Sequence, residues 1–238
     1  MARLEAIIRF YDILSRLERC IGGERTLANC GGKMTWPERG VYFFFENGEV
    51  RSTSGTGPRI VRVGTHAIKT GKEESTLWGR LRDHRGLLHG KYAGGGNHRA
   101  SVFRKHVGSA LLNKAQRQTE LERWLKGSSA PLAIRYAEHG IECEVSKHIR
   151  CMPFLWVAVN DAPGSQSDRK FIEKNSIALL SNYLRVDDPI DLPSSCWLGR
   201  HAPNDKVRKS GLWNDEYVDE SWTAEFLEVL EKYVDAMP

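Results

Sequence analysis

Residues 40–45, GVYFFF, decide the fold of this chain together with IVRVG at residues 60–64. Both stretches consist almost entirely of residues that favour β-strands. Asn47-Gly48 follows the first stretch, and this dipeptide is a strong turn signal after a strand. Because two strands this close in sequence pair most simply with each other, they predict an antiparallel hairpin.

Further elements are predicted on both sides of this hairpin. Residues 154–159, FLWVAV, predict a third strand that is apolar on both faces and therefore lies inside a covered sheet. Residues 24–39 read as a loop, and residues 134–149 fit either a helix or an edge strand. Helical spacing predicts helices over residues 3–21, 76–85 with Ser75 as N-cap, 101–126 with a break near Asn113, 169–183 with Asp168 as cap, and 223–235.

These elements predict an α+β fold with a small three-stranded antiparallel sheet flanked by helices, a helical insertion and a C-terminal extension. We expect residues 1–35 to form an N-terminal helix and loop. Residues 36–185 would form the core, interrupted by a basic insertion at 86–150. Residues 186–238 would form an extension that packs on this core.

Composition narrows the class of protein. The chain has 238 residues, of which 40% are hydrophobic, and this share is enough for a real core. The net charge of +5 favours an acidic partner only weakly. The distribution of charge along the chain is more informative, because residues 80–117 contain many Arg, Lys and His but a single acid, Asp83. Such a face suits a phosphate-bearing partner, although a solvated loop face is the alternative interpretation.

Cysteine usage and hydropathy favour a reduced, aqueous environment. The five cysteines form no C-x-x-C pair, and no histidine spacing completes a zinc site. We therefore expect free thiols in a cytoplasm. The N-terminal pattern contains acids, unlike a signal peptide, and no uncharged run approaches the length of a membrane span.

Several short motifs in a fixed order carry the candidate chemistry: Gly40-Val41-Tyr42 and Arg62-Val63-Gly64 in the predicted hairpin, Arg80 and His84 in the helix that follows, and Glu173 and Asn182 further on. Their order resembles the GIY-YIG nuclease superfamily. Gly40-Val41-Tyr42 matches the first tripeptide with one conservative change, and Arg62-Val63-Gly64 stands where the second belongs. The remaining matches are Arg80 and His84, one turn apart on a helix, Glu173 after the third strand, and, more loosely, Asn182.

The resemblance implies a GIY-YIG-like fold and hydrolysis of phosphodiester bonds at a single Mg²⁺, with Mn²⁺ as a substitute. Glu173 would bind the metal, whose other positions waters and substrate oxygens would fill. Arg80 would neutralise charge on the phosphate oxygens. Tyr42 would act as general base, because a phenolate becomes accessible next to a metal or an arginine.

Arg62 departs from the family pattern, because it stands where the second motif has a tyrosine. An arginine cannot act as a base, so proton transfer would fall to Tyr42, His84 or His66, while Arg62 could clamp a phosphate. The insertion supplies a candidate DNA-contacting surface whose binding would depend on salt. Its members are Arg99, Arg104, Lys105, His106, Lys114 and Arg117.

Three functional classes remain open from sequence. The first is a metal-dependent DNA endonuclease that acts on double-stranded DNA away from any membrane. The second is a GIY-YIG-fold module that binds nucleic acid with weak or no turnover, as Arg62 would allow. The third is a structural protein that interacts through its acidic C-terminal helix. For the first class a homodimer would allow one site per strand to make both cuts.

Overall fold

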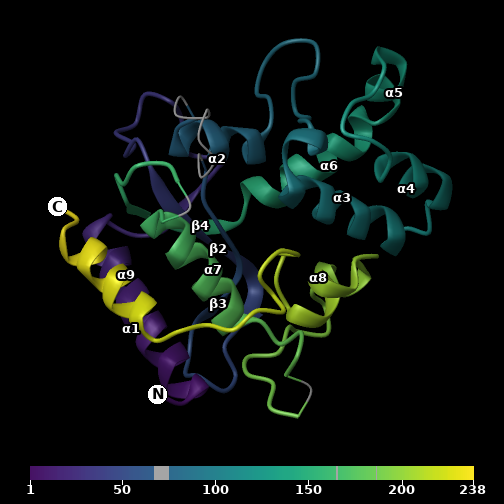
Figure 1. The fold of residues 1–238 in the computed structure, drawn as a ribbon. Coiled ribbons are helices and arrows are strands. Elements are labelled where there is room, and N and C mark those ends of the chain that lie inside the picture. The colour runs from purple at the N-terminus through teal and green to yellow at the C-terminus, as the bar shows by residue number, and fades with distance from the viewer. Residues whose placement is uncertain (67–74, 165, 186) are drawn as a thin grey trace.

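The computed structural model describes residues 1–66, 75–164, 166–185 and 187–238. Within these ranges the sheet has four strands in the order β1-β4-β2-β3, and every pair is antiparallel. Figure 1 labels β2, β3 and β4 of this sheet. The strands are β1 (Arg25–Thr26), β2 (Gly40–Val50), β3 (Pro58–Gly64) and β4 (Pro153–Ala158). The helices are α1 (Arg3–Cys20), α2 (Leu77–Arg85), η1 (His98–Ala100), α3 (Val102–Lys114), α4 (Gln118–Trp124), α5 (Leu132–Ala137), α6 (His139–Arg150), α7 (Asp168–Leu180), η2 (Leu198–His201), α8 (Asp205–Ser210) and α9 (Glu225–Asp235).

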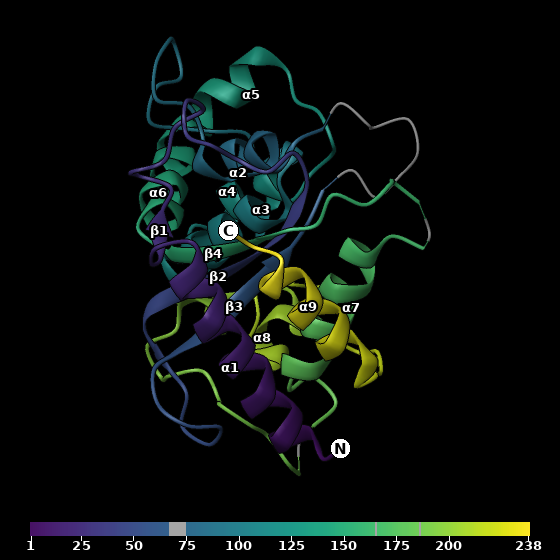
Figure 2. The ribbon, with the colours of Figure 1, turned by 90° about the vertical axis from the view of Figure 1, so that its left-hand side faces the viewer.

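Both faces of the sheet are covered, and β2 contributes side chains to both cores. Val41 and Phe43 point into one core, where α1, α7 and α9 pack; Figure 2 shows these three helices together on one side. Tyr42 and Phe44 point into the other core, which contains α2, α3 and α6. Because successive side chains of a strand alternate between faces, residues 40–45 of β2 are buried on both sides of the sheet.

The predicted fold class and the predicted hairpin are confirmed. β2 and β3 pair directly, and β4 lies between β1 and β2, so it is an interior strand as its apolar sequence predicts. The break near Asn113 is confirmed by the end of α3, and the ambiguous residues 134–149 are helical in α5 and α6. The fourth strand, β1, comes from residues 24–39, which the pattern assigns to a loop; it is only two residues long.

The turn predicted at Asn47-Gly48 is wrong. β2 continues to Val50, and the chain reverses only over residues 51–57. The register between β2 and β3 shifts here, and Gly48 takes a φ of +86°, which accommodates the bulge. Glu46 holds the bulge by accepting bonds from two indole N–H groups of the C-terminal extension, at 3.1 and 2.9 Å. These long-range contacts have no local sequence signal.

Two helix boundaries also differ from the prediction. The N-cap of α2 is Thr76 instead of Ser75, and its Oγ1 accepts a bond from the backbone of Gly79 at 3.0 Å, as capping residues do. Helix α7 begins at Asp168 and ends at Leu180, three residues earlier than expected. Its N-cap is Ser167, so the prediction that Asp168 caps the helix is wrong; the Asp168 carboxylate accepts a bond from the Tyr233 hydroxyl of α9 at 2.6 Å.

The C-terminal extension completes both the core and the sheet. The backbone N–H of Trp213 donates to Val61 of β3 at 2.6 Å. The side chain of Asn214 then accepts from Val63 N at 3.2 Å and donates to Val63 O at 2.9 Å. The outer edge of β3 is therefore bonded to a segment that is not itself a strand. Among the described residues no helix is long and apolar enough to cross a membrane.

Candidate functional site

The hairpin and α2 bring Tyr42 and His84 into contact. Tyr42 Oη and His84 Nε2 lie 2.8 Å apart, and both side chains are fully buried. The other ring nitrogen of His84, Nδ1, lies 2.8 Å from Ser101 Oγ. Burial, with the positive charges of Arg80, Arg62 and Arg104, holds the pKa of His84 well below its usual value. His84 is therefore neutral at pH 7.

Gly64 makes the room that the Tyr42 ring occupies. The two residues are partners across the β2–β3 pair. A Cβ added to Gly64 would lie 2.7 Å from Cε2 of Tyr42 and closer still to its Cζ and Oη. Any side chain here would displace the ring, so the two tripeptide motifs form one structural unit.

Glu173 reaches the end of the same hairpin from α7. Its Oε1 accepts a bond from the backbone of Thr65 at 3.1 Å, and Thr65 Oγ1 donates to Gly40 O at 2.8 Å. Burial raises the pKa of Glu173 to about 7, although Arg62, the Thr65 amide and Arg80 act in the opposite direction. The carboxyl group is thus divided between its two protonation states near neutral pH.

Arg62 and Arg80 provide positive charge beside this carboxyl group. Arg62 is nearly buried, and its Nη1 donates to Trp213 O at 2.8 Å. Its guanidinium carbon lies 5.7 Å from the ring centroid of Phe103, within the range of a cation–π contact. Arg80 is half-buried, and its Nη1 donates to Ala100 O at 2.9 Å. Neither forms an ion pair with a carboxylate among the residues that the structure describes, so both charges remain available to an anionic ligand.

His66 lies two residues beyond Gly64 and is also buried. Burial and the charges of Arg169, Arg39 and Arg80 lower the pKa of His66 to about 4, against a weaker opposing contact with the Ser75 backbone. The imidazole is therefore neutral at pH 7. Within the described part of the chain neither ring nitrogen makes a hydrogen bond of normal geometry.

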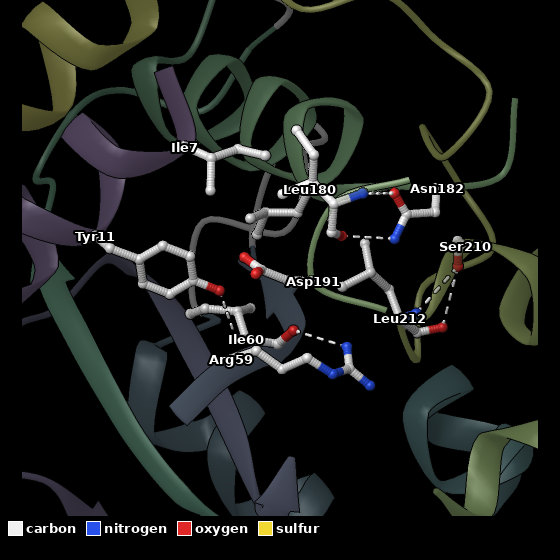
Figure 3. A pocket seen from close by; sticks show the side chains of 10 residues that line it. Ile7, Tyr11, Arg59, Ile60, Leu180, Asn182, Asp191, Ser210 and Leu212 are labelled. Atoms are coloured by element: carbon white, nitrogen blue, oxygen red, sulfur yellow. Dashed lines mark hydrogen bonds between the residues drawn. The ribbon is translucent and has the colours of Figure 1, made fainter. Parts of the chain in front are cut away.

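Asn182 lies apart from this group. Its Oδ1 accepts bonds from Ile190 N at 3.0 Å and from Arg3 at 3.1 Å, and its Nδ2 donates to Ile190 O at 2.8 Å. Figure 3 shows it at the side of a small pocket between α1 and the extension. It follows Glu173 by nine positions, and the seven of these that lie in α7 correspond to about 10 Å of helix. Asn182 therefore ties α1, α7 and the extension together.

Four of the six basic residues predicted to contact DNA are paired with acids, three of them with acids of the same insertion. Arg104 is fully buried and bonds to Glu142, which corrects the expectation that it contacts DNA. Arg99 is held by both oxygens of Glu138, at 2.6 and 2.8 Å. The other pairs are Arg117 with Glu120 and His106 with Asp215; Lys105 and Lys114 have no ion pair among the described residues.

The sequence does not predict two of the contacts at the site. Ser101 binds His84, and Thr65 binds Glu173. Ser101 does carry a local signal, because it directly precedes a helix and caps α3. Its contact with α2 is tertiary, however, and no spacing predicts it.

The described residues contain no group of three or more His, Cys, Asp or Glu that could hold a metal ion. A single carboxylate with an unpaired oxygen suits Mg²⁺, because Mg²⁺ keeps several waters and takes few protein ligands. Glu173 meets that description, since only its Oε1 has a hydrogen-bond partner in the described ranges.

Comparison with known proteins gives one result for the whole chain. A sequence model of a family described as GIY-YIG domain matches residues 1–238. No curated protein and no solved structure matches. The family match thus includes the C-terminal extension as well as the hairpin, α2 and α7.

Proposed function

Because this chain belongs to the GIY-YIG domain family, a family of nuclease type, we propose that it is a DNA endonuclease that depends on Mg²⁺ or Mn²⁺. The observation that carries the proposal is a pair of contacts at neighbouring residues of β3's end: Tyr42, which is bonded to His84, pairs with Gly64, and Glu173 bonds to the next residue, Thr65. They lie around Gly64 and Thr65, beside two arginines without carboxylate partners in the described ranges. A phosphodiester needs this combination of a proton acceptor, positive charge and a metal-binding carboxylate.

Glu173 would hold the metal through its carboxylate. Bound Mg²⁺ would supply a Lewis acid for the charge that develops on the leaving oxygen. Glu173 must be ionised for this role and has a pKa of about 7, so metal binding near neutral pH would release a proton from it. The Thr65 amide fixes the carboxylate by bonding to Oε1 and leaves Oε2 free of protein partners within the described residues.

Tyr42 Oη would take a proton from the attacking water, and Arg62 and Arg80 would neutralise the phosphate oxygens. Tyr42 is sealed from solvent in the structure. The proposal therefore requires that substrate binding opens a path to its hydroxyl. His66 is too weak a base at its low pKa to replace Tyr42, and His84 is already engaged with it.

We propose α2 and the adjoining end of α6 as the surface that contacts DNA. Arg82 is exposed, while Arg85 and Arg150 bond to backbone carbonyls. Together with Arg80 they make no ion pair with a carboxylate in the described parts of the chain. Uncompensated charge on one surface attracts a polyanion more strongly than charge that neighbouring acids neutralise, as they do at Arg117.

A supercoiled plasmid assay tests the activity. We expect nicking with Mg²⁺ and with Mn²⁺ but none with EDTA. Glu173→Ala should abolish nicking, while Glu228→Ala, at an exposed acid on α9, should not. Cutting by Glu173→Ala at the wild-type rate would show that the metal is bound elsewhere.

A second candidate function is a binding module without turnover. The complete burial of Tyr42 and the arginine at position 62 favour it. DNA binding without cleavage under every metal would support this candidate, and absence of both binding and cleavage would exclude both candidates.

The surface is tested by the dependence of DNA affinity on salt. Arg82→Ala should lower the slope of log affinity against log salt by about one unit, if it loses one phosphate contact. The matched control is Arg117→Ala, which removes an arginine already paired with Glu120. If the slope changes in Arg117→Ala and not in Arg82→Ala, the surface that contacts DNA lies on the insertion and not on α2.

A further inference from the structure

Glu173 takes the last of a row of hydrogen bonds along the outer edge of β3. The C-terminal extension bonds to Val61 and to both backbone groups of Val63. Thr65, two residues further along the chain, donates its N–H to Glu173 Oε1 at 3.1 Å. Because alternate residues of an antiparallel strand present their backbone groups to the same edge, Thr65 offers the next donor in this row. The position of the Glu173 carboxylate therefore depends on how the backbone of Thr65 is held.

The hydroxyl of Thr65 ties this backbone to β2. Strand β3 ends at Gly64, whose partner Tyr42 belongs to the last pair of the β2–β3 ladder. Beyond that pair, Thr65 Oγ1 donates to Gly40 O at 2.8 Å. Among the described residues no other hydrogen bond joins Thr65 or His66 to β2. A side-chain bond thus holds the two chains together where the backbone ladder has ended.

The acceptor of this bond is itself fixed by β4. Gly40 pairs with Ala158 across the sheet. A Cβ added to Gly40 would overlap the backbone oxygen of Val157 and would lie 3.3 Å from a methyl carbon of Leu77. A backbone atom inside a sheet cannot move aside as the end of a flexible side chain can, so only glycine allows this close approach. The Gly40 carbonyl therefore has a defined place against which Thr65 is held.

The direction of both Thr65 bonds is unambiguous. A backbone carbonyl can only accept, so the hydroxyl donates to Gly40 O; a backbone N–H can only donate, so Glu173 accepts. A carboxyl oxygen can accept such a bond whether or not the group is ionised. Thr65 is buried, with 8% of its surface exposed, so water does not readily replace these partners.

The contacts on the other side of this segment come from α7 itself. Arg169 of α7 donates to His66 O at 2.6 Å, and Glu173 of the same helix accepts from Thr65. Both contacts move with α7. Apart from the covalent link to Gly64, the Thr65 hydroxyl is therefore the contact that sets the segment, and with it the carboxylate of Glu173, relative to β2.

We propose that Thr65 is a positioning residue, whose hydroxyl holds its own N–H in place and so orients the carboxylate of Glu173. In this orientation Oε2 of Glu173 stays free of protein partners within the described residues and available to a divalent cation. Partners that orient a ligating carboxylate in this way raise the affinity of the site for its metal. The role toward a metal rests on the proposed endonuclease function, but the positioning of the carboxylate does not.

The positioning is tested by hydrogen exchange of the residue-65 amide, measured by NMR without metal or DNA. Thr65→Val keeps the shape of the side chain and lacks the hydroxyl, and we expect its amide to exchange about tenfold faster. Thr65→Ser keeps the hydroxyl and should exchange as the wild type does. Thr65→Ala should behave as Thr65→Val does and introduces no new methyl group. One hydrogen bond is small beside the stability of a domain, so these variants should fold. Wild-type exchange in both Thr65→Val and Thr65→Ala would overturn the inference.

The role toward the metal is tested by calorimetric titration with Mn²⁺ in the absence of DNA. Thr65→Val should bind Mn²⁺ about 10-fold to 100-fold more weakly than the wild type, as is usual when a partner of a metal ligand is lost. Thr65→Ser should restore the wild-type affinity. Equal affinity in the wild type and Thr65→Val would show that the hydroxyl does nothing for the metal site.

Ser181→Ala is the matched control, because Ser181 also uses a buried hydroxyl to bond a distant backbone carbonyl, Val218 O, at 2.6 Å. It should leave both the exchange of the Thr65 amide and the affinity for Mn²⁺ unchanged. Losses equal to those of Thr65→Val would mean that any missing buried bond loosens the site, and the inference would fail. A wild-type protein that binds no Mn²⁺ would instead refute the metal site of the proposed function, and amide exchange would still decide the positioning role.

Discussion

Replacing Glu173 by Gln should stabilise the metal-free protein at alkaline pH while it removes metal-dependent cleavage. The reason is the raised pKa of this carboxyl group, about 7 in the folded protein against an ordinary value of 4.5. A carboxyl group whose pKa is raised by folding stabilises the folded protein fully at any pH below its pKa in the unfolded chain. This stabilisation is lost as the pH rises through its pKa in the folded protein, because the buried group must then ionise.

The magnitude follows from the size of the shift. One pKa unit is worth about 1.4 kcal/mol. The displacement of the Glu173 pKa from 4.5 to about 7 therefore corresponds to about 3 kcal/mol at alkaline pH. Between pH 5 and pH 8 the free energy of unfolding of wild type should fall by about 2.5 kcal/mol relative to that of Glu173→Gln. Glutamine keeps an oxygen that can accept the Thr65 N–H bond, so the substitution changes the charge and little else.

Urea denaturation at pH 5 and at pH 8, in EDTA, measures this difference. Glu228→Gln is the control, because Glu228 is exposed and has no ion pair in the described residues. Adding Mg²⁺ at pH 8 should raise the stability of wild type and leave Glu173→Gln unchanged, because a ligand stabilises only the state that binds it. The reasoning is refuted if the stability difference between wild type and Glu173→Gln is the same at both pH values.

Three further predictions concern single residues. Tyr42→Phe should reduce the cleavage rate by roughly 10²–10⁴-fold with normal DNA affinity, measured by single-turnover kinetics and fluorescence anisotropy; full activity would exclude Tyr42 as the base. Gly64→Ala should destabilise the fold by about 1–3 kcal/mol in urea and impair cleavage, whereas Gly31→Ala, with open space around it, should do neither. Arg104→Ala should destabilise the protein by about 3–5 kcal/mol in the same assay, because Glu142 would remain buried without its arginine; an unchanged stability would contradict this.

The fold was largely predictable because its main signals are local. The β-forming runs of β2, β3 and β4 and the apolar spacing of α1, α7 and α9 each follow from short stretches of sequence. The error at Asn47-Gly48 arose where a distant contact overrides a local preference. Glu46 binds indoles 151 and 167 residues away, and no window around the dipeptide contains that information.

The candidate site was predictable where motifs carry it and not where tertiary contacts do. The motifs single out Tyr42, His84 and Glu173; in the structure Tyr42 contacts His84, and Glu173 bonds to Thr65 just after β3. The pattern of charges predicted the DNA-contacting residues poorly. It assigned Arg104 to that surface, but Arg104 bonds to Glu142, which is far away in the sequence. A run of basic residues indicates a nucleic-acid surface only when the acids that neutralise it are counted too.

The bonding of the extension to β3 has a consequence for any shortened form of this protein. A chain that ended at residue 185 would expose the unpaired backbone groups of Val61 and Val63 along one side of an apolar strand. Such an edge can add a strand from a neighbouring molecule, which is a route to aggregation. Loss of the extension, by cleavage or by a premature stop, should therefore convert a discrete protein into one that self-associates, and in a cell it should lead to insoluble material before any loss of activity could be measured.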